Sequence, residues 1–266
     1  MPRQRGFPPV LKRLGQHFLN DRDALNDIAD ALRLGKDDLV VEIGPGRGAL
    51  TELLLARAGH VIAVELDREL ASRLQKSHQG DPRLTVIEAD ILNVNFADIV
   101  NRPFAVVGNV PYYITTPILF HVLQAPLPTR AVFLVQKEVA ERVVAPPGSP
   151  EYGALSVNVQ AIARPEIVRD VSADLFSPPP RVDSCVVRIT PLEETLVPVN
   201  ELPPFRVFVQ AIFGMRRKQM ANVLRSVRRV SLEDASRILA RQGIDPRARP
   251  ETLTPAQLAA LMRATN

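Results

Sequence analysis

A carboxamide, a proline and an aromatic ring stand side by side between Gly108 and Tyr112, where a buried strand is expected to end. An adenine base presents an exocyclic amine and a flat π-face. The Oδ1 of Asn109 and the carbonyl of Val110 or Pro111 could accept the two amine hydrogens, and the aromatic ring could stack on the base. Because Gly, Asn and Pro are also ordinary turn residues, this stretch alone leaves a plain turn as an equal alternative.

Three acidic residues, Glu42, Glu65 and Asp90, lie near the ends of three successive apolar runs that are expected to form parallel strands. Each alone is more often a surface turn residue. Together they would lie along the carboxyl edge of one sheet, which is where open α/β sheets bind ligands. The strand that leads to Asn109 is the fourth of the series, so the amine-binding turn is expected at the same edge.

The Gly-Pro-Gly-Arg-Gly turn at residues 44–48 separates the first of these strands from an expected helix. Its spacing differs from the dinucleotide-binding G-x-G-x-x-G pattern, and Glu42 would repel a pyrophosphate but attract a cation. Gly44 and Gly46 would let the backbone approach such a ligand. Glu65, about 20 residues after the turn, is placed to accept both hydroxyls of a ribose.

Asp90 could accept from the amine of a cofactor adenine while the backbone N–H of Ile91 donates to its ring. These groups predict a cationic ligand with ribose and adenine but no phosphate, which fits S-adenosylmethionine better than NAD. Its methyl group would face Asn109. The amine of a target adenine is a weak nucleophile, so acceptors that draw its hydrogens out of plane would favour attack, with positioning and desolvation supplying most of the rate. This chemistry requires no metal.

The elements that must position these groups alternate along the chain. Apolar runs predict strands at residues 39–43, 60–65, 84–91, 104–107, 130–136, 167–171 and 185–189. Helices are predicted at 24–34, 49–58, 118–123 and 152–163, with another from residue 137. The alternation predicts an α/β fold with a doubly wound, Rossmann-like sheet.

Phe176 precedes the stiff segment Ser177-Pro178-Pro179-Pro180. Such a segment could hold the phenyl ring as a rigid wall against a target base. The alternative, a core anchor followed by a proline-rich connection, is the more common role for a phenylalanine in this setting.

Residues 190–204 carry four prolines and form the best linker candidate, which divides the chain into domains at 1–197 and 198–266. The second domain is expected to be small and helical, with helices at 205–213, 216–225, 231–242 and 254–264 and a basic helical stretch over 216–229.

The net charge of +4 is unevenly distributed. Residues 1–22 carry five Lys or Arg against one acid, and residues 201–266 carry twelve against five, so the middle of the chain is acidic. Basic ends on an acidic body favour a nucleic-acid partner, although a solvated basic face is the simpler alternative. The candidate phosphate contacts, besides the N-terminal arm, are Arg216, Arg217, Lys218, Arg225, Arg228 and Arg229.

Composition excludes several classes of protein. No apolar run reaches the ~18–20 residues of a membrane span, and the basic N-terminus lacks the apolar segment of a signal peptide. Its arginines leave a transit peptide as an open alternative, although the motif that begins at Gly15 leaves little room for one. The single cysteine, Cys185, excludes an internal disulfide, and the four histidines show no metal-ligand spacing. We therefore expect a reduced cytoplasmic protein without metal or membrane contact.

Taken together, these motifs resemble the ribosomal RNA adenine dimethyltransferase family of the kasugamycin-sensitivity type. The resemblance extends over nearly the whole chain, as far as Arg216-Arg217-Lys218. It is carried by Gly15-Gln16-His17-Phe18-Leu19-Asn20-Asp21, Glu42-Ile43-Gly44-Pro45-Gly46, Glu65-Leu66-Asp67, Asp90, Gly108-Asn109-Val110-Pro111-Tyr112, Gln136-Lys137-Glu138-Val139, Tyr152-Gly153 and Phe176-Ser177-Pro178-Pro179-Pro180-Arg181-Val182-Asp183-Ser184.

The resemblance implies a class I methyltransferase that dimethylates two adjacent adenosines in the 3′-terminal hairpin loop of 16S RNA, on the RNA itself or on an immature 30S subunit. A monomer is expected. The resemblance places cofactor contacts at His17, Leu19, Gly44, Glu65, Asp90 and Asn109 and the target base between Tyr112 and Phe176. His17 stands where the family often has Asn, and Val110 where it usually has Leu.

Three alternatives remain open. The related large-subunit adenine methyltransferases of macrolide resistance share these motifs, and the C-terminal domain is the discriminating feature. DNA adenine methyltransferases usually carry Asp-Pro-Pro-Tyr at the target turn. A ribosome-assembly or transcription factor could keep the fold while catalysis is dispensable, although Asn109, Tyr112 and Phe176 are all present.

Overall fold

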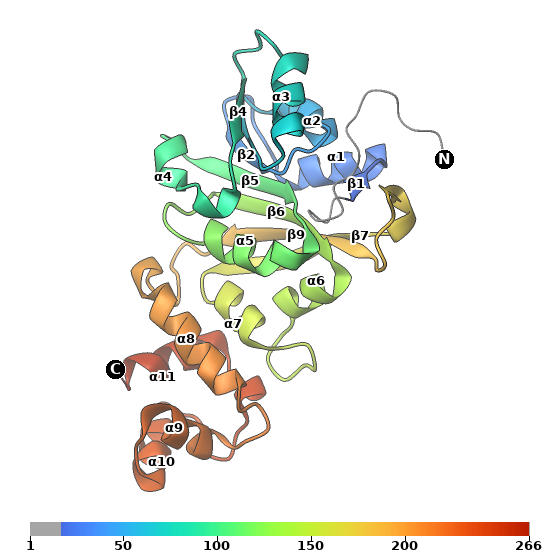
Figure 1. The fold of residues 1–266 in the computed structure, drawn as a ribbon. Helices are drawn as coiled ribbons and strands as arrows, with labels where there is room; N and C mark the ends of the chain where they lie inside the picture. The colour runs from blue at the N-terminus through green and yellow to red at the C-terminus, as the bar shows by residue number, and fades with distance from the viewer. Residues whose placement is uncertain (1–16, 266) are drawn as a thin grey trace. The chain divides into compact units, whose positions relative to one another are not determined.

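The computed structural model, which describes residues 17–265, contains a seven-stranded sheet with the order β4-β3-β2-β5-β6-β9-β7 (Figure 1). Strands β2 to β6 are parallel, and β9 pairs antiparallel with β6. Their bounds are β2 Leu39–Ile43, β3 His60–Glu65, β4 Leu84–Glu88, β5 Phe104–Asn109, β6 Arg130–Gln136, β7 Ala163–Val171 and β9 Ser184–Pro191.

Helices cover both faces of this sheet, which explains why its central strands are continuous apolar runs. On one face α1 (Arg22–Ala31) and α2 (Ala49–Arg57) pack against Val40, Val61 and Val107 in a common core. On the other face, the ring of Phe104 stacks on Phe96 of α4 (Phe96–Ile99), with centroids 5.5 Å apart. The Phe96 ring also contacts His121 of α5 (Thr115–Val122), with centroids 5.4 Å apart. The predicted doubly wound α/β fold is confirmed.

A short antiparallel pair forms a second, two-stranded sheet. Strand β1 (Phe18–Leu19) pairs with β8 (Phe176–Ser177), which sets Phe18 opposite Ser177 and Leu19 opposite Phe176. Asp21 then caps α1 by accepting from the backbone N–H of Ala24 at 2.7 Å. A similar cap starts α3 (Arg68–Ser77), which follows β3.

The described chain divides into two compact units. One runs to Ala140 and takes in Glu166–Thr190, and the other consists of Glu141–Pro165 together with the residues from Pro191 onward. These units are defined by contacts within the folded chain. The boundary predicted at residue 197 is one between independently folding domains, and it stays a prediction.

The second unit is helical. It contains α7 (Ala154–Gln160), α8 (Leu202–Phe213), α9 (Met220–Arg228), α10 (Leu232–Arg241) and α11 (Pro255–Arg263), and the residues of α6 (Lys137–Val144) from Glu141 onward also belong to it. Tyr152 is fully buried there, and its hydroxyl donates to the Leu253 carbonyl at 2.8 Å. The loop that precedes α7 is therefore anchored inside this unit.

Some element bounds predicted from the sequence are wrong. The predicted basic helix over 216–229 begins at Met220, because residues 214–218 form a tight turn in which Lys218 N–H donates to the Met215 carbonyl. The helix predicted to reach residue 163 ends at Gln160, and β7 begins at Ala163 instead. β7 is an edge strand, and an edge strand tolerates Pro165, which lacks an N–H. Within residues 17–265, no helix combines the length and the apolar content that crossing a membrane requires.

Candidate active site

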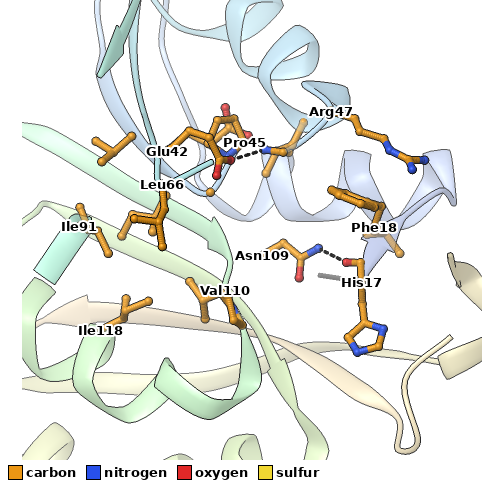
Figure 2. A pocket seen from close by; sticks show the side chains of 18 of the residues that line it. His17, Phe18, Glu42, Pro45, Arg47, Leu66, Ile91, Asn109, Val110 and Ile118 are labelled. Carbon is orange, nitrogen blue, oxygen red and sulfur yellow. Dashed lines mark hydrogen bonds between the residues drawn. The ribbon is translucent and has the colours of Figure 1, made fainter. Parts of the chain in front are cut away.

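A pocket opens at the carboxyl ends of β2, β3 and β5, between the Gly turn and the Asn109 turn (Figure 2). The parallel register sets Ile43 beside Val64 and Gly108, so the turns that leave these strands meet at one edge. The predicted site residues that line the pocket are His17, Leu19, Glu42, Gly44, Gly46, Glu65, Asp90, Ile91, Asn109, Pro111 and Tyr112.

The Gly turn fits tightly against β1. Gly46 adopts φ +57°, which favours glycine, and a Cβ there would lie 2.9 Å from the ring of Phe18. Its backbone N–H donates to Glu65 Oε2 at 2.9 Å. A side chain at Gly46 would therefore collide with the Phe18 ring of β1, beside the N–H group that holds Glu65.

Glu65 is 6% exposed and accepts two backbone hydrogen bonds, from Gly46 on one oxygen and from Asp67 on the other, both at 2.9 Å. Burial raises the pKa of this carboxyl, and the backbone donors partly oppose the effect. Each carboxylate oxygen has a second lone pair, so this fixed group retains capacity to accept from a ligand hydroxyl.

Glu42 is more deeply buried, with 1% of its surface exposed. Burial raises its pKa to about 8, although the hydroxyl of Thr51 donates to its Oε2 at 2.6 Å. At neutral pH the free protein therefore holds this carboxyl mainly in the neutral form. Sequence reasoning missed Thr51, which is a small polar residue on the buried face of α2, between Leu50 and Leu54.

Asp90 follows β4 and caps the short helix Ile91–Asn93. Its Oδ1 accepts from the Leu92 N–H at 3.0 Å, while Ile91 is buried beside it. The cap fixes one carboxylate oxygen of this pocket residue and leaves Oδ2 as a further acceptor.

Asn109 is held by the residue that directly precedes β1. Its Nδ2 donates to the backbone carbonyl of His17 at 3.1 Å, as Figure 2 shows. A carbonyl only accepts, so the nitrogen of the amide must face it, and Oδ1 is then turned the other way as an acceptor. The hydrogen bond thus orients the carboxamide.

Tyr112 is anchored at both its ring and its hydroxyl. The ring stacks on the imidazole of His17, with centroids 5.7 Å apart and planes at 20°, and the hydroxyl lies 2.7 Å from Ser184 Oγ. Burial raises the pKa of this phenol. The Nδ1 of His17 lies 2.8 Å from the Pro178 carbonyl, so the imidazole and the backbone of His17 both hold the pocket wall.

Phe176 does not line the pocket. It is 4% exposed and belongs to the core beneath β1, which matches the alternative of a core anchor. Its predicted contact with a target base stays a prediction, and it requires the ring to leave the core. Residues 1–16, with the predicted arm cations and Gln16, lie outside the described residues.

The six predicted phosphate-binding residues all belong to the second unit, but their surroundings differ. Arg217, Lys218, Arg225 and Arg229 are exposed. Arg216 is half-buried and donates to the Pro150 carbonyl at 3.0 Å, and Arg228 donates to Thr265 Oγ1 at 2.9 Å while its guanidinium covers the ring of Phe208. Among the described residues, no cluster of three or more His, Cys, Asp or Glu could hold a metal ion.

Known proteins match this chain along most of its length. Residues 10–265 match the family described as Ribosomal RNA adenine dimethylase. The Ribosomal RNA small subunit methyltransferase A of Bordetella pertussis is 44% identical over 255 residues, which cover 95% of this chain and 93% of that protein.

Solved structures agree in fold. A dimethyladenosine transferase from Plasmodium falciparum superimposes with a TM-score of 0.81 at 27% identity, over 93% of this chain and 96% of that one. The 23S rRNA methyltransferase ErmE superimposes with a TM-score of 0.72 at 30% identity, over 93% of this chain and 99% of that one.

Proposed function

This chain belongs to the ribosomal RNA adenine dimethylase family, and on that basis we propose that it transfers methyl groups from S-adenosylmethionine to the N6 amines of two adjacent adenosines in small-subunit ribosomal RNA. The observation that carries the proposal is the pocket itself. It combines an oriented carboxamide at Asn109 with acidic side chains at the ends of three parallel strands.

The residues of the pocket fit the methyl donor. Glu42 and Glu65 are buried carboxyls without a neighbouring metal cluster in the described chain, and a ligand with positive charge would relieve the cost of ionising them. Glu65 would hold the ribose, Asp90 and Ile91 the adenine, and His17, Leu19, Gly44 and Gly46 the remaining wall. When bound, the donor supplies an electrophilic methyl group on a sulfonium.

The chain's own contribution to the reaction is to hold the target amine. Oδ1 of Asn109 would accept one amine hydrogen, and a backbone carbonyl of the following turn the other. The Pro111 carbonyl already accepts from the Ile114 N–H at 3.1 Å and the Thr115 hydroxyl at 3.2 Å. We therefore assign the second amine hydrogen to the carbonyl of Val110, with Pro111 shaping the turn and Tyr112 stacking on the base.

The target base must leave its stack to enter the pocket, which costs a few kcal/mol and is least costly in a hairpin loop. We propose that the exposed cations of the second unit supply affinity for the RNA backbone, on free 16S RNA or on an immature 30S subunit. The protein would act as a cytoplasmic monomer and without a metal.

The second candidate is methylation of the large-subunit RNA, because ErmE covers almost the same extent of chain. The curated relative at 44% identity carries the small-subunit name, which favours the first assignment. Incubation with labelled donor and with undermethylated small or large subunits, followed by mass spectrometry of the RNA, tests both. We expect dimethyladenosine at two adjacent positions of the small subunit, and label confined to the large subunit would refute the proposal. Absence of label from both would favour an assembly factor in which catalysis is dispensable.

A further inference from the structure

The pocket is lined by several acidic side chains but, within the described part of the chain, by a single Lys or Arg, Arg47. This residue lies in the Gly turn directly after Gly46. Its guanidinium carbon is 4.3 Å from the centre of the Phe18 ring, a cation–π contact that is visible in Figure 2. The backbone of Phe18 pairs with Ser177, and its ring packs closely over Gly46, where a side chain would collide with it.

We propose that Arg47 forms a carboxylate subsite, which binds the α-carboxylate of the amino-acid part of the methyl donor. The inference rests on the proposed function and extends it by naming the part of the donor that Arg47 binds. Neither the sequence motifs nor the similar proteins assign a role to this arginine. The chemical class of the ligand at this subsite is the free carboxylate of an α-amino acid.

Charge is the first argument for this subsite. The amino-acid end of the donor carries an ammonium and a carboxylate. Glu42 and Glu65 attract the ammonium, but once ionised they repel the carboxylate at short range in a poorly solvated pocket. A cation in the same wall would offset that repulsion. Among the described residues, Arg47 is the one cationic Lys or Arg side chain that lines the pocket.

Geometry is the second argument. A guanidinium stacks through its face and donates through its edge, so contact with Phe18 and with a carboxylate are compatible, and the planar fork matches a carboxylate in a bidentate manner. Helix α2 begins at Ala49, two residues later, and its cap residue, Gly48, has no side chain that could accept from the N–H groups of the first turn. The positive end of that helix favours an anion at the same turn.

One turn would then serve two parts of one ligand. The Gly46 N–H orients Glu65, which is assigned to the ribose, and the next side chain along the backbone holds the carboxylate. The glycines on both sides of Arg47 have a separate cause, since Gly46 and Gly48 adopt φ +57° and +83°, which favour glycine.

The test compares two ligands that differ only in this group. S-adenosylhomocysteine and its decarboxylated analogue are titrated calorimetrically into the full chain and into Arg47→Met. We expect the unaltered protein to prefer the carboxylate ligand by ~10-fold or more, and Arg47→Met to lose that preference while binding of the analogue changes less than about twofold. Arg73→Met is the matched control, because Arg73 is exposed on α3 and lies outside the pocket.

Equal weakening of both ligands would overturn the proposal, because Arg47 would then act only by supporting Phe18. Unchanged affinity for both, with a raised KM for RNA, would also overturn it and assign Arg47 to a phosphate. Arg47→Lys covers the case in which the methionine variant does not fold. Lysine keeps the positive charge but lacks the two parallel N–H donors of the guanidinium. A smaller but measurable preference for S-adenosylhomocysteine over the decarboxylated analogue supports the subsite, and loss of that preference refutes it. If S-adenosylhomocysteine does not bind the unaltered chain, the proposed function fails instead.

Discussion

Ionisable groups differ in burial between the pocket and residues 216–229 of the second unit, which we call the basic segment. Glu42 and Glu65 are almost completely buried, and burial raises the pKa of both. Arg217 and Lys218 are exposed to solvent. Buried groups interact strongly with a few fixed neighbours, whereas exposed charges are screened and act through their number. Single substitutions should therefore have large, ligand-specific effects in the pocket and small, salt-dependent effects in the basic segment.

The largest effect is expected for Asn109→Ala. The change removes the acceptor proposed for the target amine, so methyl transfer should fall by at least ~100-fold, the usual loss for one catalytic hydrogen-bonding group. Donor affinity, measured by calorimetry, should stay within about tenfold. Asn109→Asp is a sharper variant, because a carboxylate oxygen would face the His17 carbonyl in place of Nδ2. Unchanged turnover in single-turnover assays would remove Asn109 from the reaction.

A smaller but clear effect is expected for Glu65→Ala on donor binding. The substitution removes the proposed acceptor of the ribose hydroxyls and also releases the N–H groups of Gly46 and Asp67. Hydrogen bonds to charged groups each contribute about 1.5–3 kcal/mol, so the dissociation constant of S-adenosylhomocysteine should rise by ~10–100-fold. Glu65→Gln keeps the shape and should retain part of the affinity. Equal affinity in all three proteins would refute the ribose assignment.

Glu42→Gln should change the pH dependence of stability. The pKa of Glu42 rises from 4.5 in the unfolded chain to about 8 in the folded protein. Its contribution to stability is therefore fully present below pH 4.5 and is lost as pH rises through about 8. Glutamine cannot ionise, so the variant should gain relative to the parent as pH rises, with a Tm difference a few degrees larger at pH 8 than at pH 5.

The same group should make donor binding depend on pH. Ionised Glu42 attracts a cationic ligand, so the affinity of the parent should increase as pH rises through about 8. In Glu42→Gln this increase should vanish, although the hydroxyl of Thr51 can still donate to the new side-chain oxygen. Parallel pH profiles for parent and variant, measured by calorimetry, would show that another group is responsible.

Much of this pocket could be predicted from the sequence, because the end of a buried strand is marked by the change from an apolar run to polar or turn residues. Glu65 ends an apolar run, and Asn109 begins a turn marked by glycine and proline. Parallel strands bring such ends to one edge whatever the details of packing. The fold class and the proximity of these residues follow from the same rule.

Side-chain partners between distant segments could not be predicted. The bond from Asn109 to the His17 carbonyl and the pair of Tyr112 with Ser184 join residues far apart in the chain, and no local pattern encodes such contacts. Phe176 shows the same limit, since a ring before a proline segment can face a ligand or the core. Pairing of β8 with β1 buries it in this structure.

The smallest effects belong to the basic segment, where exposure separates residues that the sequence grouped together. Arg217→Gln combined with Lys218→Gln removes two exposed charges. The salt dependence of RNA binding should flatten by about one unit of slope for each phosphate that the variant no longer neutralises, with little change in Tm. Filter-binding or fluorescence titrations between about 50 and 200 mM salt measure the slope.

Arg216→Gln is the matched comparison, because Arg216 donates to the Pro150 carbonyl and lies 3.6 Å from Glu251 within the same unit. Its guanidinium is held by partners, so the substitution should lower Tm measurably while changing the salt slope less than either exposed residue does. The reverse result, a stable protein with a flattened slope, would mean that the arginine leaves these partners for a phosphate. Burial would then be a poor guide to which cations of this segment hold RNA, and the contrast between pocket and basic segment would lose its physical basis.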